Sequence, residues 1–121
     1  MRHGFPPDIW EAAKDEAKAL MIERAKKLGM ITYSELVKGM TSIKLEPNSS
    51  RLSDMLGEIS SEEDAANRGM LTALVVHKQG DMEPGPGFYI LAASLGRNTR
   101  DKQKCWIEEL HRVHEYWSAK R

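Results

Sequence analysis

Residues 30–78 constrain the fold more than any other part of the chain, because short segments of different periodicity follow one another there. Met30-Ile31-Thr32 is apolar and has room for only a brief strand. Thr32 and Glu35 have the spacing of a capping box, in which the hydroxyl and the carboxylate each accept a hydrogen bond from an unpaired backbone amide. We therefore expect Thr32 to begin a helix whose inner face includes Leu36.

A second helix and a second strand are expected to complete this stretch. The helix follows three good N-cap residues, and its buried stripe has the spacing i, i+3, i+4 and i+7. The N-cap candidates are Asn48, Ser49 and Ser50, and the stripe is Leu52, Met55, Leu56 and Ile59. Residues 70–76 are a continuous, mostly apolar run, which predicts a strand buried on both faces. This order of elements is typical of a winged helix-turn-helix, with the turn-rich residues 77–87 as its wing.

Long helices are expected on both sides of this core, which spans about residues 30–90. Apolar residues at helical spacing predict a first helix over residues 8–28, after a loose start at residues 1–5. Asp101 is expected to cap a last helix over residues 101–119. Residues 88–95 fit either a returning strand or a helix, and the poor strand propensity of alanine favours the helix. The terminal helices are expected to meet on one side of the core through Trp10, Trp106 and Trp117.

Length and composition fit one domain over residues 1–121, mostly α-helical with a small β-sheet, an α+β fold. The chain has 18 basic and 18 acidic residues, so a free-standing basic nucleic-acid binder is disfavoured, although a local basic patch is compatible with this balance. The single cysteine and the lack of a signal-like stretch favour the cytoplasm. No apolar run approaches the roughly 20 residues that cross a bilayer, so no membrane partner is expected.

The string Ile31-Thr-Tyr-Ser-Glu-Leu36, followed by a Ser-Arg-Leu helix and an apolar run, resembles the DNA-binding winged-helix part of the alkylguanine-DNA alkyltransferase family. The likeness covers about half of the chain and implies the winged-helix fold. The alkyl-acceptor motif of that family, Pro-Cys-His-Arg, is absent, and Cys105 lies elsewhere, in Lys-Cys-Trp on an expected helix. The resemblance therefore implies the fold without the transfer activity. The whole chain also resembles small bacterial proteins, which implies no mechanism.

DNA binding is the first functional hypothesis, because a winged helix normally places its second helix in the major groove. Residues 48–68 carry two arginines and five acidic residues, a net charge of minus three that opposes docking of the whole helix on phosphate. Only the start of this helix and the bases near it suit DNA. The candidate contacts are Lys38, Lys44, Asn48, Ser49, Ser50, Arg51 and Lys78. The basic segment from Arg97 to Arg121 is a second candidate.

Binding to a partner protein is the alternative hypothesis, since an acidic recognition helix fits a protein better than DNA. The Pro- and Gly-rich residues 84–87 and the outward face near Asp54 are its candidate contacts. A metal-dependent nuclease is the third hypothesis, because carboxylates can hold a metal that activates water. Its residues would be Glu58, His77, Lys78, Asp81 and Glu83.

Other reactive side chains favour neither an enzyme nor a cofactor. Cys105 has lysines nearby that would lower a thiol pKa, but a half-buried, inert cysteine is the commoner arrangement. His111 and His114 lie one turn apart, as zinc ligands do, yet no third ligand converges in the sequence. His114 is expected to border the core and His111 to pair with Glu115. We therefore expect no catalytic residue, no bound metal and no cofactor.

Overall fold

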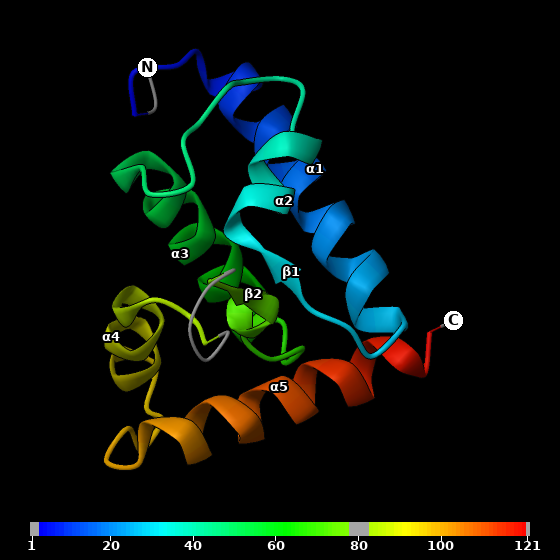
Figure 1. Cartoon of the computed structure of the whole chain (residues 1–121), viewed down its shortest axis with the longest axis vertical. Helices are drawn as coiled ribbons and strands as arrows, with labels where there is room; N and C mark the ends of the chain where they lie inside the picture. The colour runs from blue at the N-terminus through cyan, green and yellow to red at the C-terminus, as the bar shows by residue number, and fades with distance from the viewer. Residues whose placement is uncertain (1–2, 78–82, 121) are drawn as a thin grey trace.

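The computed structural model describes residues 3–77 and 83–120 (Figure 1). These residues contain five α-helices, one 3-10 helix and two short strands. Their order and bounds are α1 (Pro7–Lys26), β1 (Ile31–Thr32), α2 (Tyr33–Gly39), α3 (Ser50–Ala65), η1 (Leu71–Leu74), β2 (Val75–Val76), α4 (Pro86–Ser94) and α5 (Lys102–Ser118). The mostly α-helical fold with a small sheet is confirmed.

Helix α1 is the long support on which α2, α3 and α5 pack. Its first turn contains a proline, which the unpaired amides of a helix start tolerate, and an acidic residue that suits the positive end of the helix dipole. One face of the helix is fully buried from Trp10 to Ala25. Most of this stripe was predicted from the sequence, but Leu28, expected at its end, is 60% exposed, and the helix ends two residues earlier than expected.

The capping box at Thr32 is confirmed in both directions. The Glu35 amide donates to the Thr32 hydroxyl at 3.1 Å, and the Thr32 amide donates to the Glu35 carboxylate at 3.0 Å. Because this cap turns the chain at once from strand to helix, β1 is only two residues long. It pairs in parallel with β2, with Ile31 opposite Val75 and Thr32 opposite Val76.

The strand predicted over residues 70–76 is wrong for its first part, because Leu71–Leu74 form the 3-10 helix η1. The whole segment is buried, as predicted, but its amides find side-chain acceptors. The Met70 amide donates to the Glu109 carboxylate at 2.8 Å, and the Thr72 amide donates to the Ser60 hydroxyl at 3.1 Å. A continuous apolar run indicates burial and leaves the choice between strand and helix open.

The segment after the loop is a helix, so the helical alternative for residues 88–95 is confirmed. Helix α4 begins at Pro86, at the Pro-Gly-Phe corner where the helix was expected to start, because proline is accepted in a first turn. Residues 78–82, five of the eleven residues of the expected wing, lie outside the described residues. Within the described chain no strand returns from this loop, and the sheet is the parallel pair β1 and β2.

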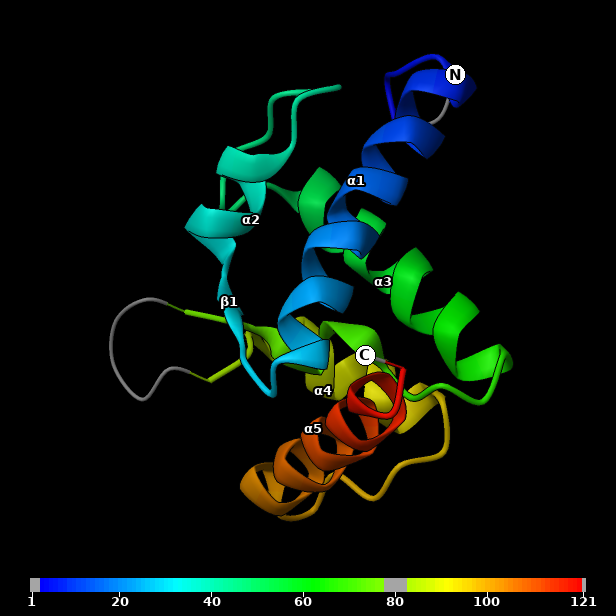
Figure 2. The ribbon, with the colours of Figure 1, turned by 90° about the vertical axis from the view of Figure 1, so that its right-hand side faces the viewer.

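Helix α5 crosses below the C-terminal end of α1 in Figure 1, and Figure 2 shows it lying across that end. Asp101 caps it, accepting from the Lys104 amide at 3.1 Å. The His114 ring nitrogen lies 2.9 Å from the Gly29 carbonyl, and the Trp106 indole donates to the Ala73 carbonyl at 2.8 Å. The terminal helices do meet, but the expected role of Trp10 is wrong, because its indole lies at the other end of α1.

Candidate binding groove between α2, α3 and α4

A hollow of about 250 Å³ opens between α3 and α4, and it adjoins a second of about 370 Å³ beside the start of α2. We call the two together the α3–α4 groove. Its α3 wall is Ser53, Leu56 and Gly57, its α4 wall is Gly87, Phe88 and Leu91, and the shared end is Tyr33, Pro47, Asn48 and His77. The groove joins segments more than 50 residues apart in the sequence.

Tyr33 fixes the width of the groove at its shared end. Its hydroxyl accepts a hydrogen bond from the Gly85 amide at 3.0 Å, which holds the start of α4 against α2. The Tyr33 and His77 rings lie 4.9 Å apart, tilted by 35°. A Cβ atom on Gly85 would come within 3.1 Å of the Tyr33 hydroxyl, so a larger residue there would widen this corner. Burial raises the pKa of Tyr33, which therefore keeps its proton as a donor.

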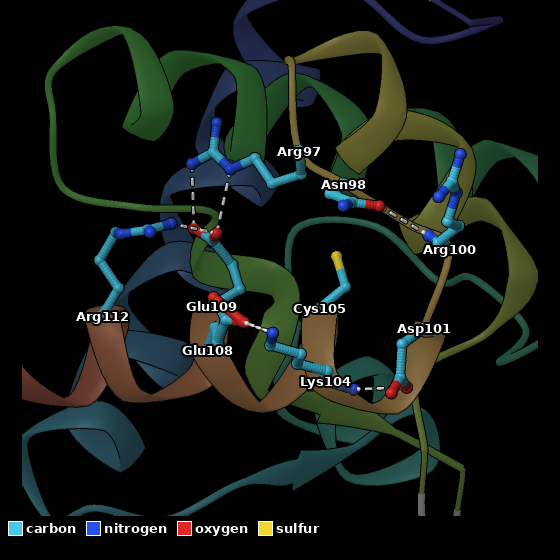
Figure 3. A pocket seen from close by; sticks show the side chains of 9 residues that line it. All are labelled: Arg97, Asn98, Arg100, Asp101, Lys104, Cys105, Glu108, Glu109 and Arg112. Carbon is cyan, nitrogen blue, oxygen red and sulfur yellow. Dashed lines mark hydrogen bonds and ion pairs between the residues drawn. The ribbon is translucent and has the colours of Figure 1, made fainter.

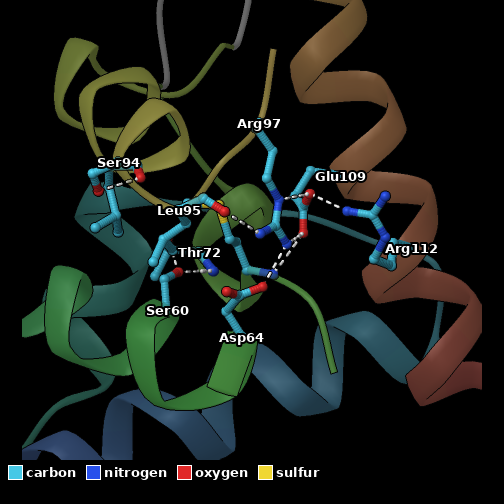
Figure 4. A network of polar contacts seen from close by, with 10 residues as sticks. Ser60, Asp64, Thr72, Ser94, Leu95, Arg97, Glu109 and Arg112 are labelled. Atoms are coloured by element: carbon cyan, nitrogen blue, oxygen red, sulfur yellow. Dashed lines mark hydrogen bonds and ion pairs between the residues drawn. The ribbon is translucent and has the colours of Figure 1, made fainter. Parts of the chain in front are cut away.

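Thr72 lines the groove, and the Ser60 hydroxyl beside it is its polar partner. The Ser60 and Thr72 hydroxyls lie 2.5 Å apart, and both residues are buried (Figure 4). Because each hydroxyl has its partner, neither needs a ligand to satisfy it. The surface that a ligand would meet comes instead from Leu56, Phe88 and Leu91.

Two glycines keep the walls of the groove open. A Cβ atom on Gly57 or on Gly87 would meet no heavy atom of the described residues within 4 Å. Gly57 lies in the middle of α3, where glycine costs about 1 kcal/mol relative to alanine. No close contact within the described chain requires a glycine at this position. A glycine in such a wall lets another backbone approach closely at that point.

The predicted DNA contacts are spread over several surfaces. Asn48 lines both parts of the groove, whereas Lys38 borders another hollow beside Thr32, Ser34 and Glu35. Ser49 serves as the N-cap of α3, since its hydroxyl accepts from the Arg51 amide at 3.1 Å.

The remaining predicted contacts do not converge either. The Arg51 guanidinium lies over the Phe5 ring, 5.4 Å from its centroid, on the side of α3 that faces the start of the chain. Lys44 and Ser50 are exposed. Lys78 lies outside the described residues.

The acidic residues of α3 face other helices through ion pairs. Lys14 of α1 contacts Glu58 at 3.1 Å and Glu62 at 2.7 Å. Glu63 is buried and pairs with Lys18 and Arg68. Asp64 pairs with Arg97 at 2.6 Å. Their negative charge is thus largely neutralised, and the repulsion expected for this helix is confined mainly to Asp54, which is exposed.

A hollow of about 390 Å³ lies at the start of α5 and does not activate Cys105 (Figure 3). The side chain of Cys105 is only 6% exposed. Burial, followed by the charge of Glu109, raises the pKa of its thiol. Arg97 and Arg112 on this wall are both engaged by Glu109. The arrangement gives an inert thiol among structural ion pairs.

The residues of the nuclease hypothesis are not assembled by the described chain. The Glu58 carboxylate accepts from the Trp10 indole at 3.0 Å and from Lys14 at 3.1 Å, on the α1 side of α3. His77 stacks on Tyr33 instead, and Asp81 lies outside the described residues. Across residues 3–77 and 83–120, no cluster of three or more His, Cys, Asp or Glu residues could hold a metal ion.

Sequence reasoning found Asn48 and, among the candidate contacts at residues 84–87, Gly85, Pro86 and Gly87, but it missed the rest of the groove. Gly57 could have indicated the site, because glycine in the middle of an amphipathic helix is destabilising and often has a packing or functional role. Tyr33 and His77 gave no signal, since their meeting depends on the parallel pairing of β1 and β2.

Comparison of the chain with protein-family models, with curated proteins and with solved structures gives no match. No helix among the described residues is long and apolar enough to cross a membrane.

Proposed function

We propose that this protein is a non-catalytic binding module whose α3–α4 groove holds an extended segment of a partner protein. The observation that carries the proposal is the pair of side-chain-free positions, Gly57 and Gly87, facing an apolar interior. An extended backbone can pass between two such walls and place one apolar side chain over Leu56, Phe88 and Leu91.

The chemistry around the groove suits a peptide better than a charged ligand. Its rim offers uncharged polar groups from Tyr33, Asn48 and Ser53, which can bond the amides of a passing chain. Ile90, one residue before Leu91 on α4, is 73% exposed and extends the apolar surface beside the groove. An apolar centre with a polar rim is the usual make-up of a protein interface. The single, buried cysteine suits a reducing compartment, and we place this function in the cytoplasm.

Selection of peptides from a random display library against the folded chain tests this function. We expect the selected peptides to share an apolar residue and to shift NMR signals of Gly57, Gly87 and Leu91. Gly57→Leu should fill the groove and reduce affinity at least tenfold, since leucine is a good helix former and keeps α3 intact. Ala65→Leu, at an exposed position of the same helix, is the matched control. Peptides that bind Gly57→Leu as tightly as the parent would refute the groove as their site.

DNA binding is the second candidate, supported by the ion pairing of α3. With Glu58, Glu62 and Glu63 paired to bases, Asp54 is the main acid left exposed near the start of α3. The resemblance of residues 31–36 to an alkyltransferase winged helix implies the same role.

A mobility-shift titration at low salt separates DNA binding from peptide binding. Arg51→Glu and Lys38→Glu should weaken any shift, and the affinity of the parent chain should fall steeply with salt. Lys27→Glu, at the residue just after α1 and 67% exposed, is the control. The absence of a shift at low salt would remove this candidate and leave the peptide groove untouched.

A further inference from the structure

The α3–α4 groove has a separate compartment beside the start of α2, which we call the side hollow. It measures about 370 Å³ and is lined by Tyr33, Ser34, Pro47, Asn48 and His77. The two open glycine walls border the other compartment and not this one. A backbone that passes between those glycines therefore runs beside the side hollow, and the part of the partner that enters the hollow is a side chain.

The lining of the groove is uncharged. Among the described residues, the two compartments are lined without a single Asp, Glu, Lys or Arg, although these four types make up 30% of the chain. A charged group that entered would give up hydration and find no opposite charge on the wall to replace it. The side hollow therefore suits an uncharged side chain.

The polar side chains of the side hollow have unused hydrogen-bonding capacity. The Tyr33 hydroxyl accepts from the Gly85 amide at 3.0 Å, and within the described chain its own O–H group has no acceptor. The side chains of Asn48 and His77 likewise make no hydrogen bond to another described residue. The Asn48 amide can donate and accept, and a neutral imidazole has one donor and one acceptor in either tautomer. The wall thus offers donors and acceptors together.

Two of these groups face the same small space. A Cβ atom on Gly85 would lie 3.1 Å from the Tyr33 hydroxyl and 3.4 Å from His77 Nε2. The two rings are 4.9 Å apart, centroid to centroid. One ligand group of a few atoms can therefore reach both side chains at once.

We propose that the side hollow binds the carboxamide side chain of an asparagine or glutamine in the partner segment, an inference that rests on the proposed peptide function of the groove. A carboxamide is uncharged, and it both donates and accepts. Its oxygen can accept from the Tyr33 hydroxyl, and its NH₂ group can donate to Asn48 Oδ1 or to the unprotonated nitrogen of His77. A carboxylate offers only acceptors and an ammonium only donors, so each would leave part of this wall unpaired.

Substitution within peptides selected from a random display library against the folded chain tests the carboxamide. We expect these peptides to share an asparagine or glutamine at a fixed spacing from their apolar residue. Replacing that residue by methionine or by glutamate, which both resemble glutamine in length, should lower the affinity for the parent chain at least about tenfold, because hydrogen-bonding groups of the wall then lose their partners.

Two variants of the chain assign this preference to the side hollow. His77→Phe keeps a ring beside Tyr33 but removes both nitrogens, and Asn48→Leu removes the amide at an exposed position before α3. Each should reduce the advantage of the glutamine peptide over the methionine peptide several-fold. His111→Phe and Gln103→Leu, at exposed positions of α5, are the matched controls and should keep the advantage of the parent.

The possible failures separate this inference from the function on which it rests. Selected peptides that lack a carboxamide, yet lose binding in Gly57→Leu, would overturn the inference and leave the peptide groove standing. An undiminished preference for glutamine in both His77→Phe and Asn48→Leu would overturn it as well. A library that yields no binder would refute the groove function and this inference together.

Discussion

A single carboxylate, Glu109, joins three separate parts of the chain at the residue scale. Its side chain is 1% exposed, and it accepts from the Met70 amide at 2.8 Å and from the Arg97 guanidinium at 3.0 and 3.1 Å (Figure 4). Arg112 donates to it as well. Burial alone would raise the pKa of Glu109, but the donors from Arg97 and Met70 outweigh it and hold the pKa below its usual range. The group therefore stays ionised inside the protein.

Replacing Glu109 by glutamine should destabilise the fold strongly. The amide keeps the shape of the side chain but removes the charge that Arg97 and Arg112 need, and breaking a buried ion pair costs about 3–5 kcal/mol. Chemical denaturation with urea would measure the loss as a lower midpoint. Glu108→Gln, at the exposed neighbouring position, should change the unfolding free energy by less than about 0.5 kcal/mol. Equal effects of the two changes would contradict the role given to Glu109.

At the scale of elements, the helices were predictable wherever local rules decide them. The cap at Thr32, the stripe of α3 and the cap at Asp101 all lie within a few residues of sequence, and all three are confirmed. Helix η1 was not predictable, because its amides are satisfied by Ser60 and Glu109, which are distant in sequence. The residues Ser60 to Glu63 also fit a capping box and would predict a break in the helix there, but α3 continues through them because the Ser60 hydroxyl bonds Thr72 instead.

The groove was less predictable than the helices, for a related reason. Asn48 could be named as a polar residue before a helix, but its neighbours in space come from α2, from α4 and from His77, which follows β2. From the sequence alone, Tyr33 can be recognised only as the first residue of a helix. Only the folded chain shows that its hydroxyl bonds the Gly85 amide.

The capping box at Thr32 offers a direct test of how much a helix cap contributes to the stability of the protein. Thr32→Ala removes the acceptor of the Glu35 amide and should lower the unfolding free energy by about 1 kcal/mol, the usual loss for a capping hydroxyl. Thr32→Ser keeps the hydroxyl and should recover most of that loss. Urea denaturation of the three proteins makes the comparison. A serine variant as unstable as the alanine variant would mean that packing of the threonine methyl, rather than the cap, is what matters.

Gly57→Ala separates the stability of α3 from the use of its groove. The new methyl meets no described atom within 4 Å and improves helix propensity, so the unfolding free energy should rise by about 0.5–1 kcal/mol. The same methyl projects into the groove and should weaken binding of the selected peptides several-fold. Thermal denaturation and a fluorescence binding assay measure the two effects. A variant that is more stable and binds equally well would show that the glycine is not kept for the groove.

At the scale of the whole molecule, charged side chains connect helices that are far apart in sequence. Lys14 of α1 reaches Glu58 and Glu62 of α3, and Arg97, which precedes α5, reaches Asp64 of α3 and Glu109 of α5. The equal numbers of acids and bases in the sequence thus correspond in part to cross-links between elements. Because such links need ionised carboxylates, the assembly as a whole depends on pH.

Acid should therefore destabilise the protein by protonating these carboxylates. Glu58 should determine the stability that is lost at the lowest pH values. Burial opposes ionisation of Glu58, but donors from Trp10, Lys14 and His3 outweigh it and hold its pKa at about 2, against 4.5 for a free side chain. A carboxyl with a lowered pKa in the folded state contributes its full stability above the unfolded pKa and loses it as pH falls toward the folded pKa. The loss from Glu58 should fall between about pH 4.5 and 2, with an upper limit of about 3 kcal/mol.

Urea denaturation at a series of pH values from 7 to 2.5 measures this loss, and two variants assign it. Glu58→Gln should be less stable than the parent at pH 7 and should lose less stability on acidification, so the two curves converge near pH 2.5. Glu23→Gln, at an exposed position of α1, should run parallel to the parent over the whole range. The pKa values of Glu63 and Glu109 are also lowered, so some acid dependence must remain in Glu58→Gln. Curves for the parent and Glu58→Gln that stay parallel would mean that the tie between α1 and α3 is not held by this charge.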